Sequence, residues 1–157
     1  MPTPDFVIAL RTRIGHDPLW LSGVTAVILD EARERILLVR RADDGAWTPV
    51  TGIIDPGEQP AVAARREAEE EAGVAIEVVR LASTSVTDEV VYPNGDRSRY
   101  LDLTFECRHV SGDPYPADGE ASETAWFALD AMPEMSDSMR WRIDTALADG
   151  PARFLRD

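Results

Sequence analysis

The chain has 157 residues, 44% of them hydrophobic and 29% charged, a balance typical of one globular domain rather than a disordered segment. Its formal net charge of -13 would repel a polyanion, so we expect no nucleic-acid partner. Cys107 is the single cysteine and leaves no internal disulfide or multi-cysteine zinc site. Residues 1–13 lack a signal-peptide pattern and the apolar run 19–29 is too short to span a bilayer, so we expect a cytoplasmic protein with no membrane partner.

The first third of the chain predicts a short helical segment followed by strands. Residues 1–18 form the N-terminal helical segment, in which apolar residues alternate with polar ones. The β-rich runs 22–30 and 35–42 flank a charged turn at 31–34 and predict a hairpin. The run 46–52 predicts one short strand that ends at a glycine.

Residues 60–72 have the clearest helical pattern. Pro60 suits the first turn of a helix, and Gly73 suits a left-handed stop after its last turn. Four alanines would share one side of this helix and allow close packing against a sheet: Ala61, Ala64, Ala68 and Ala72.

The rest of the chain adds strands and a closing helix. The runs 74–86 and 99–110 flank an Asn-Gly turn, and 123–129 predicts a further strand. Residues 136–150 predict a helix with Ser136 or Asp137 as its N-cap. The whole is an α/β domain with a mixed sheet and helices on its faces.

The helix at 60–72 gathers acidic residues. Glu67, Glu70 and Glu71 fall within an arc of roughly 100° and repel one another. Arg66 can reach Glu70 one turn on, but one guanidinium cannot neutralise three carboxylates. With only oxygen donors at hand, the expected counterion is Mg²⁺ or Mn²⁺. The alternative is a plain solvated helix face, which charge runs usually form.

The spacing around this helix resembles the Nudix box. Over residues 52–74 the chain has the fixed residues of that signature at their expected spacing: Gly52, Glu58, Arg66, Glu67, Glu70, Glu71 and Gly73. The resemblance implies a single Nudix domain over 1–157, an α/β/α sandwich with a mixed sheet. It also implies a hydrolase that cleaves the pyrophosphate bond of a nucleoside diphosphate linked to another moiety. One departure is Thr51, which stands where many members of the family have glycine, and it leaves open how this loop approaches the substrate.

The same resemblance implies roles for the matched residues. Glu70 and Glu71 would be metal ligands, Glu67 a further ligand or the group that helps to deprotonate water, and Gly52 a ligand through its carbonyl.

Glu58 and Arg66 would hold the loop and helix together by charge pairing. Members of the family often have one more acid before a Trp-containing strand. Glu120 has that spacing from Trp126, with Glu123 as the alternative and plain solvent exposure as the competing interpretation.

Several aromatic and basic residues are candidates for substrate binding. Aromatic rings could stack on a base and guanidinium groups could contact phosphate or sugar, although residues of this kind near strand ends are more often core or rim. The candidates are Trp47, Tyr92, Tyr100, Arg41 and Arg99.

We therefore expect a small nucleotide as the partner, and a homodimer is compatible with the sequence. Nucleotide sugars such as ADP-ribose, (deoxy)nucleoside triphosphates and dinucleoside polyphosphates all stay open. The alternatives are a non-catalytic Nudix-like nucleotide sensor or interaction module, and an isomerase of allylic diphosphates, for which Cys107 offers no evident site.

Overall fold

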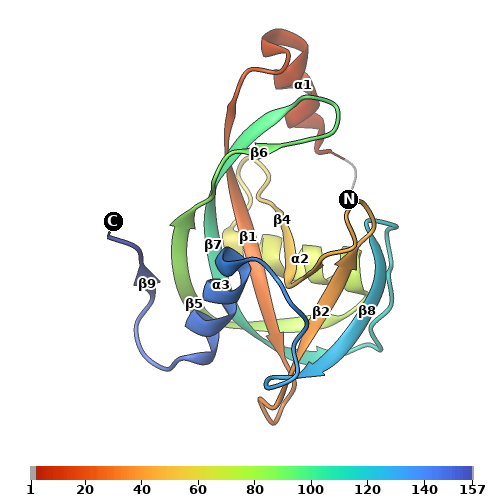
Figure 1. The fold of residues 1–157 in the computed structure, drawn as a ribbon, viewed down its shortest axis with the longest axis vertical. Helices are drawn as coiled ribbons and strands as arrows, with labels where there is room; N and C mark the ends of the chain where they lie inside the picture. Colours follow the sequence, from red (N-terminus) through yellow and green to blue (C-terminus); the bar gives the residue numbers. More distant parts are fainter. Residues whose placement is uncertain (1–2, 157) are drawn as a thin grey trace.

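A computed structural model describes residues 3–156 and folds them into one mixed β-sheet with helices on both of its faces (Figure 1). The helices are α1 Asp5–Ile14, α2 Pro60–Ala72 and α3 Asp137–Leu147. The strands are β1 Leu19–Leu29, β2 Arg35–Arg41, β3 Trp47–Thr48, β4 Val50–Ile53, β5 Ala75–Val86, β6 Val90–Val91, β7 Arg97–Ser111, β8 Ala121–Ala128 and β9 Arg153–Phe154.

The sheet is built around the long parallel pair β1 and β7. Its main path runs β3-β2-β1-β7-β5-β9, while β4 pairs with β1, β6 with β7 and β8 with β2. The predicted hairpin between β1 and β2 is present, but only Ile28 with Leu37 and Leu29 with Ile36 are paired. On its other side β2 pairs with β8 from Arg35 to Arg41, and β1 pairs with β4 from Gly23 to Ala26.

The two faces of the sheet carry separate cores, which confirms the predicted sandwich. On β1, Val24 and Ile28 belong to the cluster that packs against the alanines of α2. Val27 and Leu29, which alternate with them, belong to the cluster that packs against α3. Both strand faces are buried because each is covered by a helix, so the apolar run of β1 is nearly continuous.

The prediction of a single strand at 46–52 is wrong, because the chain forms two short strands there with different partners. Trp47–Thr48 pairs with β2, whereas Val50–Ile53 pairs with β1. Pro49 lies between them, and proline has no N–H with which to continue a ladder. The break moves the following residues next to β1 and sets Gly52 opposite Val24.

Other boundaries also differ from the prediction. β1 begins at Leu19 rather than at residue 22, because it pairs with β7 from Leu19 and Ser98 onward. α3 ends at Leu147 rather than at residue 150. Of the two predicted N-caps, Ser136 is the one present, and its hydroxyl accepts a hydrogen bond from the Met139 N–H. The short strand β9 was not expected. Within residues 3–156, no helix combines the length and apolar character needed to cross a bilayer.

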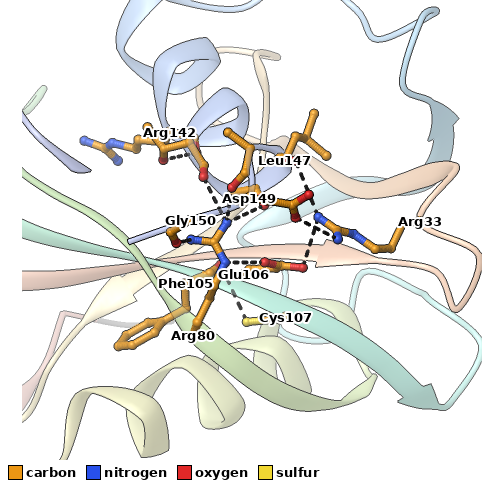
Figure 2. Close-up of polar contacts among 12 residues, drawn as sticks. Arg33, Arg80, Phe105, Glu106, Cys107, Arg142, Leu147, Asp149 and Gly150 are labelled. Atoms are coloured by element: carbon orange, nitrogen blue, oxygen red, sulfur yellow. Dashed lines mark hydrogen bonds and ion pairs between the residues drawn. The ribbon is translucent and has the colours of Figure 1, made fainter. Parts of the chain in front are cut away.

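A cluster of ion pairs around the buried Glu106 holds the C-terminal end of α3 to the sheet (Figure 2). Arg80 on β5 pairs with Glu106 on β7, with 2.6 Å between Nε and Oε2. Arg33 reaches the other oxygen of Glu106 at 3.3 Å. The Arg80 guanidinium also donates to carbonyls at the end of α3, those of Thr145, Ala146 and Ala148. Because α3 has no basic residue in its own last turn, Arg80 supplies the positive charge that its terminal carbonyls favour.

Candidate active site

Helix α2 turns Glu67 and Glu71 inward and leaves Glu69 and Glu70 on its more exposed side. Pro60 lies at its start, and Gly73 adopts the left-handed conformation at its end, with φ of 67°. Glu67 and Glu71 are only 2% and 7% exposed, whereas the Glu70 side chain is 40% exposed. The predicted glutamate face is therefore not a solvated surface.

The alanines explain how α2 lies so close to the sheet. Ala64, Ala68 and Ala72 are fully buried, as expected, and so is Ala63. Ala61 is only half-buried and takes a smaller part in the packing than predicted. This close approach sets the Glu67 carboxylate directly against Gly52 on β4.

Arg66 holds the helix and the preceding loop together. Its guanidinium makes two hydrogen bonds to Glu58, at 2.9 and 2.8 Å, and one to the Ile53 carbonyl at 3.1 Å. The predicted charge pair between Glu58 and Arg66 is thus present. Nη1 of the same guanidinium lies 2.8 Å from Glu67 Oε1 and 3.1 Å from Glu70 Oε2. One arginine therefore balances part of the negative charge of three glutamates.

The two inward carboxylates are electrostatically unusual. Burial raises the pKa of Glu67 to about 7, opposed by the hydrogen bond and charge of Arg66 and reinforced by Glu70. Burial also raises the pKa of Glu71 to about 7, and the nearby negative charges of Asp118 and Glu67 add to the effect. Both carboxyls are in a setting where an added positive charge would be strongly stabilising.

The donor chemistry of this site suits a hard divalent cation. Glu71 Oε2 is buried and has no hydrogen-bond partner among residues 3–156, and a buried polar atom without a partner is costly. Carboxylates and a backbone carbonyl are the ligands that Mg²⁺ and Mn²⁺ prefer. Among residues 3–156, no three acidic, histidine or cysteine side chains are already gathered around one ion position. The carboxylates of Glu67 and Glu70 are instead turned to Arg66, so ligation would require them to exchange this partner.

The loop before β8 brings Asp118 near Glu71, and the role predicted for Glu120 stays a prediction. Asp118 is the acid whose charge acts on Glu71. Glu120 is joined to Asp118 through its own backbone N–H, at 2.9 Å from Oδ1, and its carbonyl accepts from Ala42. Asp118 is not among the predicted residues, because the spacing from Trp126 favours Glu120 instead. A search for acids throughout this loop would have included it.

Arg41 lies on the same side as these acids. Its guanidinium pairs with Asp43, with 2.5 Å between Nη2 and Oδ2, and lies near Asp44. The hydrogen bond to Asp43 raises the Arg41 pKa against the opposing effect of burial, and the negative charge of Glu71 also raises it. The charge of Arg41 therefore interacts with that of Glu71, although its side-chain hydrogen bonds are to Asp43 in its own loop.

The remaining substrate-binding candidates are spread over the fold. Trp47 packs edge to face on Phe127, at 4.9 Å between ring centroids, on the side of the sheet that α3 covers. The phenol oxygens of Tyr92 and Tyr100 lie 2.5 Å apart. Arg99 is exposed on β7. Within residues 3–156, none of these residues hydrogen-bonds a carboxylate of α2, and their predicted contact with substrate stays a prediction.

Comparison with known proteins identifies the family. Residues 20–149 match the family model of the NUDIX domain. The chain is 31% identical over 140 residues to a MutT-like protein of Streptomyces ambofaciens, covering 88% of this chain and 84% of that protein. It is 31% identical over 115 residues to the NAD-capped RNA hydrolase NudC of Chromobacterium violaceum, covering 72% of this chain but only 40% of that protein.

The fold agrees with this match. A UDP-X diphosphatase crystal structure superposes with a TM-score of 0.65 at 23% identity, covering 90% of this chain and 68% of that one. The chain belongs to the Nudix hydrolase family.

Proposed function

We propose that the protein is a divalent-metal-dependent hydrolase of a nucleoside diphosphate linked to another moiety. The observation that carries the proposal is the pair of buried carboxylates, Glu67 and Glu71. One oxygen of Glu71 has no hydrogen-bond partner in the described part of the chain. Two such carboxylates at 2% and 7% exposure are costly in a structural helix, but they suit a site that receives a cation together with an anionic substrate.

Glu70, Glu71 and the Gly52 carbonyl would hold Mg²⁺ or Mn²⁺. When bound, the ion supplies a positive charge that neutralises the pyrophosphate and acidifies water. Glu67, buried against Gly52, would receive the proton of the attacking water, a role that its raised pKa near 7 favours. Arg66 keeps Glu67 oriented and ties α2 to the loop through Glu58.

The nature of the substrate is supported by the relatives taken together. A NAD-capped RNA hydrolase and a UDP-X diphosphatase are named for different attached groups, but both names describe a nucleotide joined through a pyrophosphate. We therefore place this chain among enzymes that cleave such a linkage and release a nucleoside monophosphate.

A substrate panel tests the proposal. ADP-ribose, UDP-sugars, NAD and deoxynucleoside triphosphates are incubated with Mg²⁺ or Mn²⁺, and the products are identified by mass. We expect a nucleoside monophosphate from at least one diphosphate-linked compound, and reaction in ¹⁸O-labelled water locates the phosphorus that is attacked. If triphosphates are the only compounds that react, and they release inorganic pyrophosphate, the assigned substrate class is wrong.

The variant Glu71→Gln tests the site in the same panel. It keeps the size of the side chain but removes its charge, so turnover should fall by about 10² to 10⁴ while the circular dichroism spectrum is unchanged. The matched control is Glu69→Gln, on the exposed side of the same helix, which should retain activity. If the unmodified protein binds nucleotides tightly but hydrolyses none, the sensor interpretation is correct instead.

A further inference from the structure

Arg41 ends β2 on the side of the sheet that α2 covers. Leu37 and Val39, which share its alternation along the strand, belong to the core cluster that packs against α2. Arg41 pairs with Ala121 on β8, and Ala121 belongs to the same cluster. The negative charge of Glu71, in the last turn of α2, acts on the guanidinium. The Arg41 side chain therefore lies between this core and the end of α2 that carries Glu71.

The loop before β8 joins the neighbourhood of Arg41 to α2 through the backbone. The Ala42 N–H donates to the Glu120 carbonyl at 2.8 Å, and the Ala117 N–H donates to the Glu71 carbonyl at 3.2 Å. One end of this loop is thus bonded to the residue after Arg41, and the other end to the last turn of α2. These bonds fix the backbone of Arg41 relative to the candidate active site.

The present partner of Arg41 is a carboxylate two residues further along the chain. Nε donates to Asp43 Oδ1 at 3.0 Å, and Nη2 donates to Asp43 Oδ2 at 2.5 Å. An arginine holds a phosphate in the same way, with two parallel N–H groups directed at two oxygens. Asp43 therefore occupies the edge of the guanidinium that would bind a phosphate.

The pair between Arg41 and Asp43 is exposed enough to open. Its side chains are 41% and 53% exposed, whereas those of Arg66 and Glu58 are 22% and 13% exposed. Water screens an exposed ion pair, so opening it costs little, but a buried pair is costly to break. Arg66 is therefore held in place by its partners, while Arg41 can exchange its carboxylate for an oxygen of a ligand.

We infer that Arg41 binds a phosphate oxygen of the substrate and that Asp43 is a built-in competitor for the same edge of the guanidinium. Before the substrate binds, Asp43 masks Arg41. When the substrate binds, its phosphate takes the place of the Asp43 carboxylate, which turns to water. Asp43 therefore raises KM without taking part in the chemistry. That the phosphate belongs to the substrate rests on the proposed function, whereas the masking of Arg41 by Asp43 does not.

A double-mutant cycle on binding tests the inference. The probe is methylenediphosphonate, a pyrophosphate analogue that is not hydrolysed, titrated by calorimetry in the presence of Mg²⁺. Arg41→Gln should weaken its binding by about tenfold or more, because the charge-assisted hydrogen bonds are lost. Asp43→Asn should tighten binding by about two- to fivefold, which corresponds to the loss of one exposed ion pair. Added to Arg41→Gln, Asp43→Asn should change the affinity by less than about twofold, because the guanidinium for which Asp43 competes is gone.

Glu77→Gln is the matched control. It removes the same charge and frees Arg108 from a pair of similar exposure, 52% and 53%. Arg108 alternates with Cys107 of the α2-side core and so lies on the other side of the sheet. The affinity for the diphosphonate should therefore equal that of the unmodified protein. An equal gain in Glu77→Gln and Asp43→Asn would mean that only net charge matters, and the inference would be wrong. It would also be wrong if Asp43→Asn gave the same gain with and without Arg41, because Asp43 would then act through its own charge.

Kinetics separate this inference from the proposed function. Asp43→Asn should lower KM and leave kcat unchanged for a compound that the protein hydrolyses. If the binding cycle gives the expected result but no compound is hydrolysed, the proposed function is wrong and the masked site stands. If compounds are hydrolysed while Asp43→Asn changes neither the affinity nor KM, the inference is wrong and the proposed function stands. A diphosphonate that binds none of these proteins at millimolar concentration also overturns the inference, because the chain then forms no phosphate site at Arg41.

Discussion

Glu67 lies in the space that a side chain at residue 52 would need. A Cβ added to Gly52 would stand 2.0 Å from Glu67 Cδ, far inside any normal contact. The backbone of Gly52 has no special conformation, so the need for glycine comes from the neighbouring carboxylate and not from φ. The pairing of β4 with β1 fixes the position of one residue, and the alanine packing of α2 fixes the other.

Gly52→Ala should therefore displace Glu67 and abolish most of the activity. We expect turnover to fall by about 10²-fold or more and the melting temperature to fall as well, because the buried carboxylate is forced out of place. A double variant provides the control. Adding Glu67→Ala to Gly52→Ala removes the group that clashes, so it should recover stability without recovering activity. If the double variant is no more stable than Gly52→Ala, the proposed clash is not the cause.

The local parts of this site could be predicted from the sequence. Pro60 and Gly73 mark the ends of α2 because each suits one end of a helix for reasons that do not depend on distant residues. The same holds for Ser136, whose hydroxyl caps α3. The pairing of Glu58 with Arg66 was implied by the resemblance to the Nudix box, and it is present.

The parts that depend on distant contacts could not be predicted. Pro49 interrupts the strand because the residues before it pair with β2 and the residues after it pair with β1. Asp118 reaches Glu71 because the loop before β8 folds back beside the end of α2, where the Ala117 N–H bonds to the Glu71 carbonyl. Nothing in the spacing of these residues encodes that approach.

We expect Arg66 to stabilise the protein most when no metal is present. Arg66→Gln leaves Glu58, Glu67 and Glu70 without their shared partner, so the free energy of unfolding in EDTA should fall by about 2 to 3 kcal/mol. Added Mg²⁺ should raise the melting temperature of this variant more than that of the unmodified protein, because the ion then relieves a larger repulsion.

Arg65→Gln is the matched control for this comparison. Arg65 is exposed on the same helix, and its replacement should change the melting temperature little. Equal destabilisation by the two substitutions would mean that Arg66 acts only through helix propensity or general charge.

The Arg80 cluster should control how firmly α3 is attached to the sheet. Arg80→Gln leaves Glu106 partly unpaired and removes the donors to the last carbonyls of α3, so we expect a loss of about 2 to 4 kcal/mol. Hydrogen exchange measured by mass spectrometry should quicken in Asp137–Leu147 before it does in α2. Arg108→Gln, which removes only an exposed pair with Glu77, should cost less than about 1 kcal/mol. Uniform acceleration across the chain in Arg80→Gln would contradict a role confined to α3.

Cys107 should be chemically inert in the folded protein. It is 1% exposed within the α2-side core, and burial raises the pKa of its thiol to about 12, with the charge of Glu106 adding to the effect. A raised thiol pKa means that the neutral form persists well above pH 8, and the thiolate is the form that reacts. Iodoacetamide at pH 8 should therefore leave the native protein unmodified for hours, whereas the urea-unfolded chain, with an ordinary thiol pKa, should react within minutes. The modified fraction is read by intact mass, and rapid modification of the native chain would show that the strand β7 opens far more often than this buried position allows.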